Sequence, residues 1–151
     1  MSDVSNDAQM REAIGGLEVP LQRALAARFI ENVLSLTEDE RIKRVLKIAA
    51  NADADEDQLS SALRSAKAAA LDAHARCGTD GEWNDQAGYF VARAAEAAVA
   101  PRVRSYGRGP AWQAALNCRM ARTAQATETD EDAHGSESQA QYRILNDYLN
   151  S

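Results

Sequence analysis

Aromatic residues, proline and glycine are scarce in this chain of 151 residues, which has two Phe, two Trp, four Tyr, three Pro and eight Gly. A β-sandwich or barrel needs β-branched and aromatic strands separated by frequent turn residues, so this scarcity argues against both folds. The chain also has no run of about 18 apolar residues, the length that a transmembrane helix requires. Alanine, in contrast, is abundant, with 31 residues. Because alanine has the highest helix propensity, the composition predicts an all-α protein.

Cysteine is also scarce, since only Cys77 and Cys118 are present. Two cysteines do not make a disulfide framework, and the acidic N-terminus has no apolar segment of signal-peptide length. A disulfide between them would need their Cα atoms to lie within about 7 Å. We therefore expect a cytoplasmic protein with two reduced thiols.

The spacing of apolar residues predicts a compact bundle or array of about six helices. Short loops join most of these helices, which favours mostly antiparallel neighbours. Residues 1–16 are expected to form a flexible leader that ends at a Gly-Gly pair. Residues 17–151 are expected to form a single helical domain, interrupted by an acidic loop at 127–137.

Capping residues indicate where several helices begin. Pro20 suits the first turn of a helix, where its missing N–H costs nothing. Thr37 and Glu40 have the spacing of a capping box, so we expect a helix to begin at Thr37. Asp55 or Asp57 can cap the next helix, which is expected to run to about residue 77.

Alanine is concentrated in two predicted helices, over residues 62–75 and 87–100. Such helices can approach one another closely, but each contact buries little apolar area. Larger side chains must then supply much of the hydrophobic stabilisation. The candidates are Phe29, Phe90, Trp112, Leu116 and Tyr148.

The formal net charge is −6, which disfavours general binding to nucleic acid or to anionic membranes. The charges are unevenly distributed, because residues 101–126 hold five Arg and no acid, and residues 127–151 hold six acids and one Arg. Arginine with tyrosine is typical of protein interfaces, and an acidic patch speeds the encounter with a basic protein. Charge therefore selects these candidate partner-binding residues: Arg102, Arg104, Tyr106, Arg108, Glu128, Asp130, Glu131 and Asp132.

Catalytic and metal-binding patterns are weak. His74 and Cys77 are three residues apart and can share a helix face, but zinc needs further ligands and thiol catalysis needs an orienting third group. A small buried Cys and a partly exposed helical His are the ordinary explanation. The carboxylates lie mostly in first turns or loops, where capping and solvation account for them. We therefore expect a protein that is not an enzyme and has neither cofactor nor metal.

The order of segments resembles a known family. An apolar helix leads into a charged turn and a basic helix, in LAARFIENVLSLTEDERIKRVLKIAA at residues 25–50, and two alanine helices follow, with LRSAKAAALDAHARC and YFVARAAEAAVA. This arrangement, over roughly residues 25–123, resembles the alanine-rich helical immunity proteins of bacterial polymorphic toxin systems. The resemblance implies a non-enzymatic protein that neutralises a cognate toxin by occluding its active site, helped by charge complementarity.

Three other functions stay open on the sequence alone. The first alternative is a helical regulatory or scaffold module that self-associates through its alanine faces or through residues 102–108. The second is an enzyme that uses His74, Cys77 or a carboxylate pair, and it predicts that these groups converge in a pocket. The third is a nucleic-acid-binding protein that uses Arg102, Arg104, Tyr106 and Arg108, and it predicts binding that falls steeply with salt.

Overall fold

A computed structural model describes residues 3–80, 83–101, 109–125 and 133–150, and over these residues the protein is an all-α array without strands. The fold class predicted from the sequence is confirmed, with seven α-helices in the described ranges where about six were expected. None of the described helices is long and apolar enough to cross a membrane. The elements are α1 (Asp7–Gly15), α2 (Val19–Glu31), the short 3-10 helix η1 (Leu34–Leu36), α3 (Glu40–Ala50), α4 (Glu56–Asp80), α5 (Trp83–Val99), α6 (Gly109–Gln125) and α7 (Ala133–Leu149).

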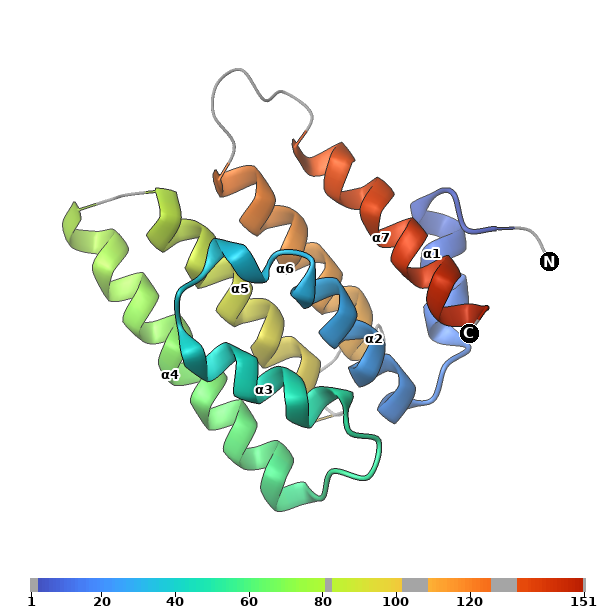
Figure 1. Cartoon of the computed structure of the whole chain (residues 1–151), viewed down its shortest axis with the longest axis horizontal. Helices are drawn as coiled ribbons and strands as arrows, with labels where there is room; N and C mark the ends of the chain where they lie inside the picture. The colour runs from blue at the N-terminus through green and yellow to red at the C-terminus, as the bar shows by residue number, and fades with distance from the viewer. Residues whose placement is uncertain (1–2, 81–82, 102–108, 126–132, 151) are drawn as a thin grey trace.

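The helices form a row that is covered on one face. Helices α4, α5, α6 and α7 lie side by side in chain order, and each runs antiparallel to the one before it (Figure 1). Helices α2 and α3 pack across one face of this row, and α1 lies behind α6 and α7 on the other side (Figure 1). We call the side of the row away from α2 and α3 the back face.

Alanine builds the contacts within the row. Ala66 of α4, Ala94 and Ala98 of α5, and Ala114 of α6 are completely buried, so the helices can pack closely. Phe29 of α2 is also completely buried and fills the space above the row. Of the large side chains expected in the core, Phe29 and Trp112 are buried, whereas Phe90, Leu116 and Tyr148 are only partly buried. Aliphatic residues supply most of the remaining bulk, for example Met10, Ile14, Leu25, Ile30, Ile42 and Leu145.

Two of the three predicted helix starts are confirmed. Pro20 lies in the first turn of α2. Asp55 caps α4, because its side chain accepts from the Gln58 N–H at 2.8 Å. The Gln58 side-chain oxygen in turn accepts from the Asp55 N–H. The expected start at Thr37 is wrong, because α3 begins at Glu40 and its cap is Asp39, two residues after Thr37. The Thr37 hydroxyl instead accepts from the Asp39 N–H, which holds the turn before the helix.

Two segments expected to be irregular are helical. Residues 7–15, inside the expected flexible leader 1–16, form α1 with Met10 and Ile14 fully buried. Residues 133–137, inside the expected acidic loop 127–137, belong to the first turn of α7. Both segments have polar sequences, but a few of their residues make specific contacts with other helices. Helix α4 also continues past residue 77, the expected end, to Asp80.

Candidate functional site

The back face carries a groove between α4 and α5. Lys67, Arg93 and Glu96 line a hollow of about 350 Å³ together with His74 and Tyr89. No residue of α2 or α3 lines this hollow, so the groove lies on the face that these helices leave open. Helix α5 is buried on the sides that contact α2, α3, α4 and α6. The α5 residues that line the hollow, Tyr89, Arg93 and Glu96, lie on its remaining side.

Two further hollows extend the groove toward Pro101. A hollow of about 240 Å³ shares Lys67, Arg93 and Glu96 with the first one and adds residues of α6. Another, of about 350 Å³, shares Leu63, Ala100 and Pro101 with the second hollow and continues beyond the back face to residues 56–60 and to Arg23 of α2. We call the three adjoining hollows the α4/α5 groove.

Basic side chains in this groove are incompletely paired. Arg93 forms an ion pair of 3.5 Å with Glu96 one helical turn away. Lys67 is exposed and forms no ion pair within the described part of the chain. Within the described residues, the Nε of Arg23 is buried without a hydrogen-bond partner, and burial lowers the pKa of this guanidinium. A buried donor without an acceptor costs free energy in the folded protein.

Apolar and aromatic groups accompany these charges. Leu71 is 68% exposed, which is the highest value among the large hydrophobic residues described as exposed. His74 and Tyr89 face each other across the groove, with ring centroids 5.6 Å apart. Tyr89 also contacts Phe90 edge-on at 5.3 Å. The groove therefore combines cations with a partly exposed apolar surface.

The other half of the back face is covered by α1. Arg119 of α6 has only 2% of its side chain exposed, and it donates to both Asp7 carboxylate oxygens at 2.8 and 3.0 Å. Its Nε donates to Gln141 of α7 at 2.8 Å, and the Tyr142 hydroxyl donates to Asp7 at 2.7 Å. These bonds join three helices, and the Arg119 hydrogen bond holds the pKa of Asp7 below its ordinary value of 3.8. We call this network the Arg119 clamp.

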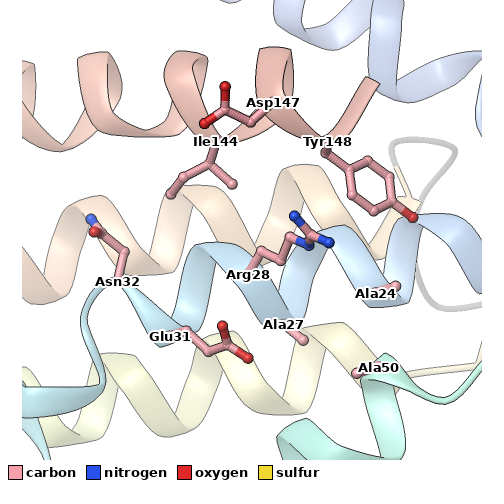
Figure 2. A pocket seen from close by; sticks show the side chains of 9 residues that line it. All are labelled: Ala24, Ala27, Arg28, Glu31, Asn32, Ala50, Ile144, Asp147 and Tyr148. Carbon is pink, nitrogen blue, oxygen red and sulfur yellow. The ribbon is translucent and has the colours of Figure 1, made fainter. Parts of the chain in front are cut away.

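Another hollow, of about 650 Å³, lies between α2 and α7 (Figure 2). Figure 2 shows Ile144 and Tyr148 of α7 pointing toward Ala24, Ala27 and Arg28 of α2, whereas the Asp147 carboxylate points away from α2. Glu31, Asn32 and Ala50 lie at the edges of the hollow. The Arg28 guanidinium lies 5.0 Å from the Tyr148 ring, and the Tyr148 hydroxyl donates to the Leu21 carbonyl at 3.0 Å. Asn32 is held by Glu137, to which its amide donates at 2.9 Å. These contacts hold α2 against α7, so Arg28, Asn32 and Tyr148 have structural roles here.

All the partner-binding residues selected by charge lie outside the residues that the structure describes. These are Arg102, Arg104, Tyr106 and Arg108 in the segment 102–108, and Glu128, Asp130, Glu131 and Asp132 in the segment 126–132. The two other arginines of the basic segment are described, and both are used internally. Arg119 forms the clamp, and Arg122 pairs with the buried Glu137 at 3.1 Å.

The pair of His74 and Cys77 is only half described. His74 is exposed and contacts Tyr89, whereas the side chain of Cys77 lies outside the described part. Within the described ranges, no group of three or more His, Cys, Asp or Glu residues could hold a metal ion. Cys118 is a free thiol in the core, and burial raises its pKa, which disfavours the thiolate that acts as a nucleophile.

Sequence reasoning missed the α4/α5 groove. One signal was present in α4, where Arg64, Lys67, Leu71 and His74 follow one another at spacings of three and four residues. These large side chains lie off the buried stripe of Ala66, Ala69 and Ala73. In a helix made mostly of alanine, a second stripe of large residues indicates a second contact surface.

Comparison with known proteins gives no relative: no family model, no curated protein and no solved structure matches the chain.

Proposed function

We propose that this chain is a non-enzymatic binding protein that neutralises a cognate bacterial toxin, acting in the cytosol of the cell that makes it. The proposal extends the resemblance to alanine-rich immunity proteins stated for residues 25–123. Its single strongest support in the structure is the α4/α5 groove, where the exposed Leu71 lies beside cationic and aromatic side chains. Neutralisation works by occlusion, because a protein bound over the toxin's active site excludes its substrate.

The composition of the groove suits protein recognition. Tyrosine and arginine are enriched among the residues that dominate binding energy at interfaces, and Tyr89 and Arg93 line the same hollow. An isolated exposed leucine needs no explanation, but one that adjoins such a hollow adds apolar area to it. The groove also lies on two closely packed helices, so little conformational entropy is lost when a partner binds.

Co-expression with the product of the neighbouring gene tests this function. The wild-type chain is expected to restore growth to cells that make the toxin and to co-purify with it. Leu71→Asp is expected to abolish co-purification, because it places an unpaired charge in the interface. Leu21→Asp is the matched control, since Leu21 is 44% exposed on α2, away from the groove, and it is expected to retain binding. Absence of both rescue and co-purification with the wild-type chain would contradict the proposal.

Self-association is the alternative function, and the exposed stripe on α4 gives it some support. Arg64, Lys67, Leu71 and His74 lie at the spacing of one helix face, which a second copy could cover. Light scattering over a hundredfold range of concentration separates the two functions. A mass that stays at 16.4 kDa throughout would remove the self-associating version.

A further inference from the structure

We infer that the α4/α5 groove binds an acidic amphipathic helix supplied by the partner. The inference rests on the proposed binding function and adds the chemistry of the element that the groove receives. Three features of the described residues carry it: the charge of the groove, the length of its lining on α4, and the way in which α1 occupies the other half of the back face.

Charge defines the sign of the ligand. Arg23, Lys67 and Arg93 line the groove, against the two carboxylates of Glu56 and Glu96. Glu96 is already paired with Arg93, and Glu56 lies at the start of α4, where the helix dipole favours a negative charge. Among the described residues, Lys67 and Arg23 form no ion pair, so carboxylates on the partner would meet cations in the groove.

The pattern of the lining fits a helix. On α4 the lining residues Leu63, Lys67, Ala70 and His74 recur at intervals of four, three and four, which is one continuous face of the helix. The lining begins at Glu56, so it spans eighteen residue steps, or about 27 Å at 1.5 Å per residue. A partner helix of about five turns would follow this face, with apolar residues against Leu63 and Leu71 and acidic residues toward the cations.

Helix α1 is the internal precedent for this arrangement. It lies on α6 of the same row, buries the apolar side chains of Met10 and Ile14, and presents the Asp7 carboxylate to an arginine. The α4/α5 half offers the same combination of an apolar strip and cations, but none of the described helices covers it. A helix with acidic and apolar faces would complete the back face as α1 does on its own half.

Peptide binding tests the inference directly. The probe is a fluorescein-labelled 20-residue helix with leucine at positions i, i+3, i+4 and i+7 and glutamate flanking the leucine stripe. Its control replaces every glutamate with lysine. Anisotropy with the full-length chain at 50 mM salt is expected to detect binding of the acidic helix only, and tenfold weaker binding at 300 mM salt, because charge pairing is screened.

Charge reversal locates the site. Lys67→Glu and Arg93→Glu are each expected to weaken binding of the acidic helix at least tenfold. Lys47→Glu is the matched control, because Lys47 is exposed on α3, outside the groove, and it is expected to change the affinity less than twofold. Circular dichroism verifies that each variant is folded. Equal binding of the two peptides, equal loss with Lys47→Glu, or no binding of the acidic helix overturns the inference.

The test separates this inference from the proposed function. If the neighbouring toxin is neutralised but the acidic helix does not bind, the inference fails and the function stands. If the acidic helix binds in the groove but no toxin is recognised, the function fails and the groove stands. A dimer that Arg93→Glu dissociates would assign the groove to a second copy of the chain, and would also overturn the inference.

Discussion

The two halves of the back face use their arginines differently. On the α6–α7 half, the Arg119 side chain is 2% exposed, and its guanidinium donates to the Asp7 carboxylate of α1 and to the Gln141 amide oxygen of α7. In the α4/α5 groove, Arg23 of α2 keeps a buried Nε without an acceptor, and Lys67 has no ion pair among the described residues. In the first half the Arg119 guanidinium is fully paired within the described residues, although the Nε1 of Trp112 on α6 is buried without a partner there. The groove presents cations without an ion pair beside an exposed leucine.

This difference indicates that one half of the back face contributes to stability and the other half to binding. Matched buried charges stabilise the native state mainly because removal of one partner is costly. Unmatched groups lower stability, so their presence in a folded protein requires a reason other than folding. The comparison predicts that substitutions in the α6–α7 half lower stability, whereas those in the α4–α5 half change binding.

The largest expected effect is the loss of the Arg119 clamp. Arg119→Met is expected to lower the free energy of unfolding by about 3 kcal/mol, because it leaves the Gln141 amide oxygen buried without its donor and removes the anchor of α1. Arg93→Met in the groove is expected to cost less than about 1 kcal/mol, since its ion pair is exposed. Urea unfolding at pH 7 measures both, and equal losses would remove the distinction between the halves.

Apolar side chains provide the second contrast. Met10 of α1 is completely buried, so Met10→Ala is expected to cost about 2–3 kcal/mol. Leu71→Ala is expected to stay within about 0.5 kcal/mol of the wild type, because its side chain is mostly in solvent. Thermal unfolding of the two variants provides the measurement. A large loss for Leu71→Ala would mean that this side chain contributes to the core after all.

Periodicity predicted the fold class well. The cap at Asp55 and the place of Pro20 in the first turn of α2 each depend on residues within one or two turns, and both are confirmed. Helix α1 was missed because its nine residues carry few apolar groups, and the contact that holds it spans 112 positions, from Asp7 to Arg119. Local sequence does not contain that partner.

The groove was missed for a related reason. Nothing in the sequence indicates which face of α4 remains uncovered, since that depends on how α2, α3 and α1 are distributed over the row. The charge of the basic segment was also misleading at Arg119 and Arg122, whose guanidinium groups pair with Asp7 and Glu137 inside the molecule. Residue type alone does not separate an arginine that pairs inside the molecule from one that faces a partner, and only the fold does so.

Acid provides a third test of the comparison. The folded-state pKa of Asp7 lies below 3.8, so its contribution is complete above pH 3.8 and is lost as the pH falls through the folded-state pKa. Asp7→Asn is expected to cost about 1 kcal/mol at pH 7, and the difference from the wild type should shrink toward pH 2–3. Asp147→Asn at the hollow between α2 and α7 is the control, with little change expected at pH 7. Urea unfolding across this pH range would contradict the assignment if both variants behaved alike.

The smallest expected effect has the opposite sign, and it concerns Arg23. Arg23→Met removes a partly buried cation whose Nε has no acceptor and keeps a flexible side chain of similar length, so the free energy of unfolding is expected to rise by about 0.5–1 kcal/mol. The same variant is expected to bind the acidic helix about fivefold more weakly. Arg44→Met on the exposed face of α3 is the control, and it should change neither quantity. If Arg23→Met lowered stability and left peptide binding unchanged, this arginine would belong with Arg119 as a structural residue, and only Lys67 would remain as a cation of the groove without an ion pair.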